Sequence, residues 1–232
     1  HRVSSPTVIE PLSFIWWLGI ILSIIISFAI VQIAISIPPD KRKVLMMSMG
    51  ITLILVEITQ QFYLYHLGLW DMKTSLPIHL CGISGILAGI MMLRPDQSGF
   101  EFLALIGSPG ALHAILTPQL NHGPLPFLIF KYYVSHTGII LVPLFLAIVL
   151  GHRVTGSSWY RVILFCQVLI LSIGASNYLI GSNYMYLAER PMVNNPMVIG
   201  EWPWYILGFE FIGIVHILLF YFGYRRMRPL PY

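Results

Sequence analysis

The feature that most constrains this chain is the arrangement of its apolar residues in long, nearly uncharged blocks. Hydrophobic residues make up 57% of the 232 positions and charged residues only 9%, whereas a soluble domain carries roughly 25% charged residues. A helix needs about 20 such residues to cross a bilayer, and membrane β-strands would instead alternate with period two. The sequence therefore predicts an all-α, polytopic membrane helix bundle. It excludes a soluble enzyme, a disordered chain and a disulfide scaffold.

The apolar blocks predict seven transmembrane helices in a single domain over residues 1–232. The third is short for a span and begins at Pro77. The fourth contains Ser108-Pro109-Gly110, which predicts a kink because proline removes a backbone donor inside the helix. The short gaps between blocks predict antiparallel neighbours. We predict the spans at residues 12–37, 44–67, 77–93, 99–117, 126–150, 159–180 and 203–223.

The basic residues predict the orientation. With seven spans, nine of the thirteen Lys and Arg residues, among them Lys41, Arg42 and Lys43, fall on one side. The positive-inside rule then places the C-terminus in the cytoplasm and the N-terminus outside. The net charge of +4 is explained by a cytoplasmic collar that favours anionic lipid headgroups, so no nucleic-acid partner is expected. We expect a multi-pass protein of the cell membrane whose partners are bilayer lipids.

Polar side chains inside the spans are costly in a bilayer and mark a functional site by default. In the predicted orientation, such residues from five spans fall in the outer half of the membrane, which predicts a polar pocket at that level. Glu57 shares a helix face with two of them. The alternative is that they only hydrogen-bond the helices together, at about 0.6 kcal/mol per bond. The set is Gln60, Gln61, His66, His79, Cys81, His113, His136, Asn177 and Asn183.

The two cysteines lie at different predicted depths, so both are expected to be free thiols. Cys81, near the outer end of its span, is a candidate nucleophile that needs a histidine from another span as its base. His136 is the best candidate, because Tyr132 and Ser135 share its helix face. Cys166 lies in an apolar run and is expected to be a packing residue. No pair of histidines has the spacing of metal ligands on one helix, so we expect no metal and no cofactor.

Several stretches taken together resemble one family. The set is similar to the YwaF-like integral membrane proteins of bacteria and the related human transmembrane acyltransferase of ether lysophospholipids, over about residues 40–223. The resemblance implies a lipid acyltransferase in which Cys81 is the nucleophile and His136 the base. The stretches are Leu76-Pro77-Ile78-His79-Leu80-Cys81, Thr117-Pro118, Tyr133-Val134-Ser135-His136-Thr137-Gly138, Asn183-Tyr184-Met185-Tyr186-Leu187 and Trp202-Pro203-Trp204-Tyr205.

The implied reaction passes an acyl group through a thioester on Cys81 to a lysophospholipid hydroxyl, with a phospholipid or lysophospholipid as substrate. Water as acceptor would make the same pair a lipid hydrolase. A small-solute transporter or binding protein is the alternative without covalent chemistry, and a broken fourth helix favours it. Glu57 is a candidate to orient a histidine. Candidates for oxyanion stabilisation or substrate binding are His79, Gln60, Gln61, His113, Asn177, Asn183, Tyr184 and Trp204.

Overall fold

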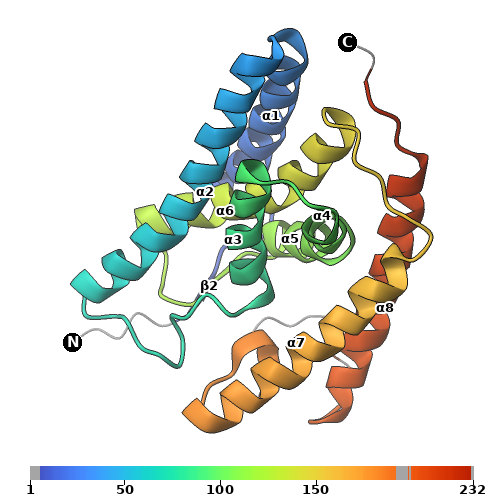
Figure 1. Cartoon of the computed structure of the whole chain (residues 1–232). Coiled ribbons are helices and arrows are strands. Elements are labelled where there is room, and N and C mark those ends of the chain that lie inside the picture. Colours follow the sequence, from blue (N-terminus) through green and yellow to red (C-terminus); the bar gives the residue numbers. More distant parts are fainter. Residues whose placement is uncertain (1–5, 192–197, 199, 231–232) are drawn as a thin grey trace.

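The computed structural model describes residues 6–191, 198 and 200–230. It is 72% helical with almost no sheet, which confirms the predicted all-α class (Figure 1). Within the described residues, six helical segments are long and apolar enough to cross a membrane. They are α1 (Phe14–Ser36), α2 (Pro39–His66), the run formed by α4, η1 and α5 (Gln97–Leu116), α6 (Pro126–Ile148), α7 (Ser158–Ile180) and α8 (Trp204–Arg226).

The third predicted span, residues 77–93, is corrected by the structure. Its helix, α3, covers only Leu80–Leu93, and 14 residues rise about 21 Å, less than the roughly 30 Å of a bilayer core. The reason lies at its start, where Pro77 belongs to a turn that passes across the first helical turn. A Cβ on Gly82 would lie 2.7 Å from the Pro77 carbonyl oxygen, so this close approach requires glycine.

The kink predicted at Ser108-Pro109-Gly110 takes the form of a π-helical turn. This turn, η1 (Leu103–Gly107), joins α4 (Gln97–Phe102) to α5 (Ser108–Leu116) without ending the helix. Pro109 has no amide hydrogen and its ring crowds the carbonyl four residues earlier, and a wider turn relieves both problems. The other five predicted spans match the observed helices with ends shifted by at most five residues.

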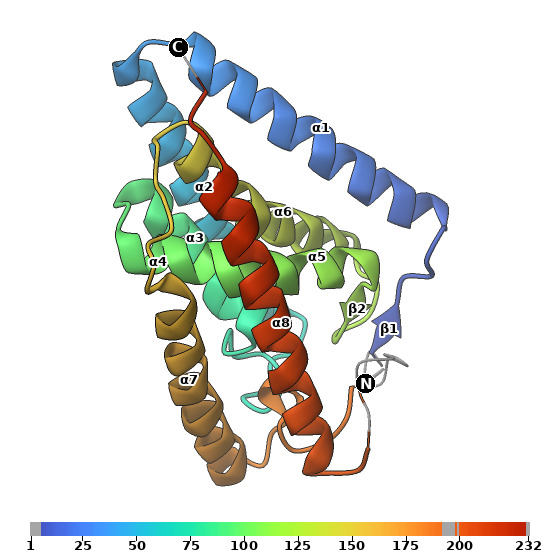
Figure 2. The same cartoon turned by 90° about the vertical axis from the view of Figure 1, so that its right-hand side faces the viewer.

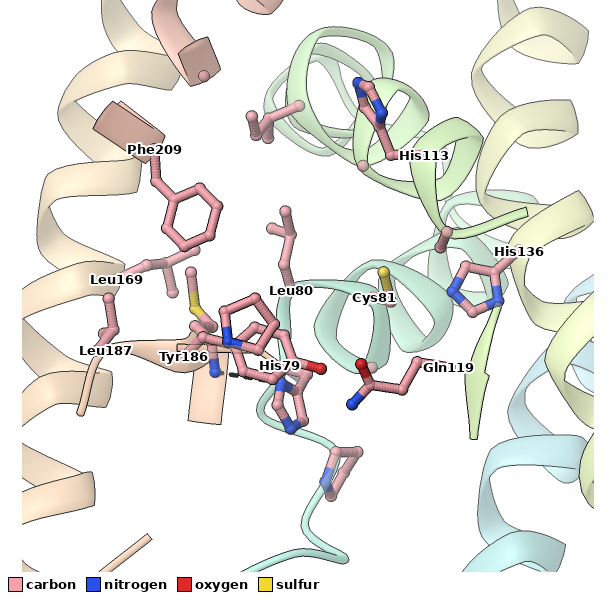
Figure 3. Close-up of a pocket in the computed structure, with 18 of the residues that line it drawn as sticks. His79, Leu80, Cys81, His113, Gln119, His136, Leu169, Tyr186, Leu187 and Phe209 are labelled. Atoms are coloured by element: carbon pink, nitrogen blue, oxygen red, sulfur yellow. Dashed lines mark hydrogen bonds between the residues drawn. The ribbon is translucent and has the colours of Figure 1, made fainter. Parts of the chain in front are cut away.

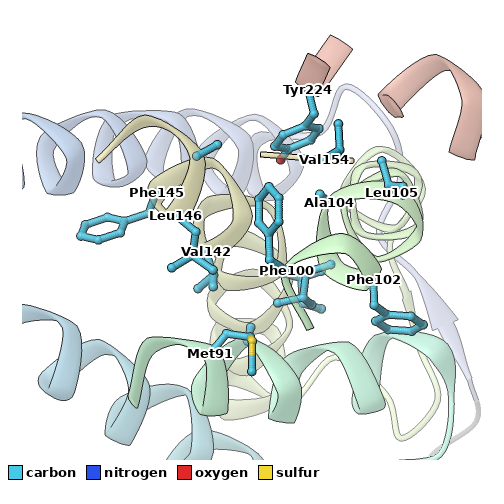
Figure 4. Packing of buried hydrophobic residues seen from close by; sticks show 14 of the residues in the cluster. Met91, Phe100, Phe102, Ala104, Leu105, Val142, Phe145, Leu146, Val154 and Tyr224 are labelled. Atoms are coloured by element: carbon cyan, nitrogen blue, oxygen red, sulfur yellow. The ribbon is translucent and has the colours of Figure 1, made fainter. Parts of the chain in front are cut away.

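The long α4–η1–α5 run crosses the centre of the bundle. Figure 1 shows α1 and α2 on one side of it and α7 and α8 on the other. Its side chains meet those of α3 and α6 in an apolar core in which Phe100, Leu105, Val142 and Phe145 are fully enclosed (Figure 4). By contrast, α1 and α7 expose apolar side chains over most of their length, as helices that face lipid do.

The two ends of the bundle differ. One end carries a short antiparallel pair, β1 (Thr7–Val8) with β2 (Gln119–Leu120), and a 3-10 turn, η2 (Tyr184–Tyr186). We call it the outer end, following the predicted orientation. The end of α8 and the turn between α1 and α2 both lie at the opposite, inner end (Figure 2). Most of the basic residues in the described part of the chain lie at this inner end.

Candidate functional site

A cavity of about 520 Å³ lies among α2, α3, α5, α6, α7 and α8, and its wall extends from the outer loops to Ile163 on α7. This size is within the roughly 300–1,000 Å³ of small-molecule sites. Cys81 and His136 both line it, and Figure 3 shows them on facing elements, α3 and α6. Both cysteines are free thiols, as predicted, but Cys166 also lines this cavity while packing against the core.

Cys81 is placed by the start of α3. His79 is the N-cap residue of this helix, so Cys81 is its second residue. The first amide groups of a helix have no partner within it and point along its axis with partial positive charge. No described residue accepts a hydrogen bond from the amides of Leu80, Cys81 or Gly82. The thiol is therefore next to a cluster of free backbone donors.

His136 is held in one orientation by its own helix. Its Nδ1 lies 2.7 Å from the carbonyl oxygen of Tyr132, one turn earlier in α6. Because a carbonyl can only accept, we assign the proton to Nδ1, which leaves Nε2 of the neutral ring as an acceptor. The Tyr132 ring also packs against the imidazole, with centroids 4.1 Å apart. Figure 3 shows a ring nitrogen of His136 turned toward the side of the cavity that holds Cys81.

The sequence led us to expect that Glu57 orients a histidine, but its carboxylate has other partners. Its carboxylate Oε1 accepts a hydrogen bond from Ser135 Oγ at 2.7 Å and pairs with Lys131 Nζ at 2.9 Å. Glu57 and Lys131 both line the cavity, and both interact electrostatically with Cys81. The Tyr132 carbonyl takes the orienting role instead, because helix rotation turns Ser135 and Lys131, and not His136, toward Glu57.

His79 attaches the outer loops to the site. Its Nδ1 accepts a hydrogen bond from the Met185 amide at 3.1 Å, and its ring packs against Tyr184 and Tyr186. Burial raises the pKa of the Tyr186 phenol, and the nearby Cys81 raises it further. The η2 turn therefore covers the outer side of the thiol, and Figure 3 shows Tyr186 beside His79.

Two loops line the outer end of the cavity, which we call its mouth, and they share a histidine. His122 Nε2 lies 3.2 Å from Ser75 Oγ and 3.5 Å from Thr74 Oγ1. Burial lowers the pKa of His122 below its ordinary value. This contact joins the loop before α3 to the loop that follows β2.

Two further histidines line the same cavity and form a pair. Nε2 of His113 on α5 lies 2.9 Å from Nε2 of His216 on α8. His216 Nδ1 is within 2.8 Å of the Ile212 carbonyl, so by the same reasoning His113 donates to His216. Among the described residues, no three His, Cys, Asp or Glu side chains gather in a way that would hold a metal ion.

Five of the candidates for oxyanion stabilisation or substrate binding lie outside this cavity, as does His66 of the predicted polar set. Each amide or phenol in this group is engaged in holding a loop. Gln61 accepts a hydrogen bond from Trp70, and Asn177 binds the backbone of Tyr184. Asn183 binds the backbone of Ala188 and Glu189, and the Tyr184 hydroxyl bridges the backbone of Met72 and Leu76. Trp204 is exposed on the first turn of α8. Gln60, His79 and His113 do line the cavity, with Glu57, Cys81 and His136.

Sequence reasoning missed some residues of the cavity wall. Lys131 and His216 carried a signal, since each is a polar side chain inside a span. Gln119 and His122 carried none, because both lie in the connection between two spans, Gln119 in β2 and His122 in the loop that follows it. Figure 3 shows the Gln119 amide reaching into the cavity between His79 and Cys81.

The fold and the cavity define a class: a polytopic membrane protein with a thiol and an imidazole inside its helix bundle. The chain belongs to the TMEM164 family, whose model matches residues 6–221. No curated protein and no solved structure shows a significant match to it.

Proposed function

We propose that this chain is a multi-pass protein of the cell membrane that moves a fatty acyl group to a lysophospholipid through a thioester on Cys81. The observation that supports it most is the joint placement of Cys81 and His136 on the wall of one cavity. The tautomer of His136 leaves Nε2 free to accept a proton. The residues that carry the resemblance to lipid acyltransferases include both side chains.

The first half-reaction transfers the acyl group to the enzyme. His136 Nε2 takes the thiol proton, and the Cys81 thiolate attacks the carbonyl carbon of a phospholipid ester. The tetrahedral intermediate carries an oxyanion, which the free amides at the start of α3 are positioned to stabilise. The carbon–oxygen bond breaks, His136 gives its proton to the leaving alcohol, and a lysophospholipid departs.

The second half-reaction reverses these roles. His136 removes the proton from the hydroxyl of an acceptor lysophospholipid, whose oxygen attacks the thioester carbonyl. The carbon–sulfur bond breaks and the proton returns to Cys81, which regenerates the starting thiol. If water is the acceptor, the same steps make a lipid hydrolase, so the lipid present at the mouth decides between transfer and hydrolysis.

The proposal is tested by intact-mass analysis of purified protein after incubation with phospholipid vesicles. We expect a hydroxylamine-sensitive acyl adduct on the wild type. It should be lost in Cys81→Ala and, because the base is gone, in His136→Asn. Cys166→Ala is the matched control, since Cys166 lines the same cavity, and it should keep the adduct. Excess lysophospholipid should discharge the adduct into a diacyl product.

Two outcomes would contradict this function. An adduct that survives in Cys81→Ala and disappears in Cys166→Ala would assign the chemistry to the wrong thiol. Absence of any adduct, together with no reaction of Cys81 with a thiol-directed probe, would favour solute binding or transport by the same cavity.

A further inference from the structure

The cavity has an apolar part that the proposed chemistry leaves unexplained. It lies between α7, which contributes Ile163, Leu169 and Ile170, and α8, which contributes Phe209, Gly213 and Ile217. We call this part the α7–α8 arm. Figure 3 shows Leu169 and Phe209 on the side of the cavity opposite His136, with Leu80 between them and Cys81. Gln167, Glu210 and His216 are the polar side chains that these two helices add to the cavity wall near this arm, and His216 is hydrogen-bonded to His113.

The α7–α8 arm extends well into the membrane. Gly213 is nine residues from the outer start of α8, so it lies about 13 Å along that helix. Ile163 is five residues from the inner start of α7, so the arm passes the middle of the bundle. An apolar cavity at this depth favours a hydrocarbon ligand over a polar one.

Gly213 leaves the middle of the arm open. A Cβ built on Gly213 meets no atom within 4 Å, whereas one on Gly19 would lie 2.2 Å from the Tyr133 ring and one on Gly138 2.4 Å from Leu53. Glycines of the second kind allow helices to approach closely. Gly213 does not serve that purpose, because the space in front of it is the cavity itself. A Cβ at this position would enter the arm without meeting a neighbour.

We propose that the α7–α8 arm binds the hydrocarbon chain of the acyl group carried to Cys81, and that Gly213 sets how long that chain can be. This inference rests on the proposed function, since it assigns the carboxyl end of the chain to Cys81. The apolar wall, its continuity with the thiol and its depth in the bilayer all favour a lipid hydrocarbon chain. The headgroup then remains at the mouth, beside Ser75 and His122.

The experiment measures chain selectivity in the full-length protein. Wild type, Gly213→Leu and Gly213→Phe are incubated with phosphatidylcholines whose acyl chains run from lauroyl through palmitoyl to stearoyl, and the Cys81 adduct is quantified by intact mass. The ratio of stearoyl to lauroyl adduct should fall by roughly tenfold or more in Gly213→Phe, and by less in Gly213→Leu, because chain atoms that no longer fit lose their binding energy. Lauroyl adduct should remain.

Gly174→Phe is the matched control. Gly174 lies on α7, also faces open space and does not line the cavity, so its chain profile should equal that of the wild type. Replacing glycine raises helix propensity at both positions. If Gly213→Phe lowers all chain lengths equally, or leaves the profile unchanged, the assignment of Gly213 is wrong.

A second measurement separates failure of the arm from failure of the chemistry. A stearic acid with a photoreactive diazirine at its methyl end is crosslinked to wild type and to Cys81→Ala, and the labelled peptides are mapped. We expect label on residues 163–170 and 209–217 in both proteins. Label there without any Cys81 adduct would overturn the acyl transfer and keep the arm as a lipid-chain site. Label elsewhere would overturn the arm, whatever the adduct shows.

Discussion

Glu101 and Glu57 are both buried glutamates with a basic and a serine partner, yet only one of them borders the cavity. At the inner end, Glu101 is 2% exposed and accepts hydrogen bonds from Ser158 and Gln97. Its two carboxylate oxygens are 2.5 and 2.7 Å from Arg161. The same Gln97 amide also donates to the Arg153 carbonyl. This group fastens α4 to the start of α7.

Glu57 has the same kinds of partner in the outer half, with Lys131 and Ser135 in place of Arg161 and Ser158. It is 4% exposed, and its side chain and that of Lys131 face the cavity that holds Cys81. The same set of partners around a buried glutamate therefore has two roles. A glutamate closed off among helices joins elements of the fold, whereas one beside a cavity also places charge near the groups that could react.

The largest effect should follow from Lys131→Met. It leaves a carboxylate buried without its cation, which costs about 3–5 kcal/mol of unfolding free energy. Denaturation in detergent micelles measures this loss, and the acyl adduct should fall with it. The double variant Glu57→Gln with Lys131→Met removes both charges and should recover most of the stability. A single variant within about 1 kcal/mol of the wild type would show that Glu57 does not depend on Lys131.

Arg161→Met should cost less, at roughly 1–3 kcal/mol, because Glu101 keeps its bonds to Ser158 and Gln97. The Arg161 side chain is 45% exposed, so water can replace part of its contribution. The same denaturation assay measures the loss, and the acyl adduct of the folded protein should equal that of the wild type. A fall in adduct yield at unchanged stability would erase the distinction between the two glutamates.

Two serine variants compare the two glutamates through one hydroxyl donor each. Ser135→Ala and Ser158→Ala each remove one hydroxyl donor to a buried glutamate. Ser135→Ala should lower the unfolding free energy by roughly 0.6–1.7 kcal/mol, as loss of a single interhelical hydrogen bond in a membrane does. Ser158→Ala should lower it by more, because Ser158 Oγ also accepts a hydrogen bond from the Thr155 amide at 2.7 Å. Only Ser135→Ala should slow formation of the Cys81 adduct, since only that serine acts beside the cavity. Equal rates for both variants would contradict this.

The sequence predicted the helices better than their contacts. Span positions follow from local hydropathy, which is why α1, α6 and α7 begin and end near their predicted residues. The helix of the third predicted span begins three residues later than predicted, because Pro77 folds back over Gly82. The apolar pattern of these residues does not reveal that contact. The π-helical turn before Pro109 likewise relieves a steric conflict. The sequence predicted a kink there but not that it would take this form.

Partners inside the bundle were harder to predict, because they depend on how each helix is rotated. Asn177 looked like a site residue, but its amide binds the backbone of Tyr184, where a loop has no other partner. Lys131 was not among the candidates named from the sequence, yet it is the cation beside Glu57. Depth in the membrane follows from position in a span, which is the basis on which His79, Cys81 and His136 were grouped, and all three line one cavity.

The smallest expected effect is a pH dependence of the unfolding temperature that arises from His122 at the outer end of the bundle. Burial lowers the pKa of His122 in the folded protein, so the unfolded chain binds the proton more tightly. Stability is then complete above the ordinary histidine pKa of about 6.5 and is lost as the pH falls below it. The unfolding temperature should drop by a few degrees between about pH 8 and pH 5, and His122→Gln should remove part of this drop. An unchanged pH dependence in the variant would show that the contact of His122 with Ser75 does not hold the mouth of the cavity.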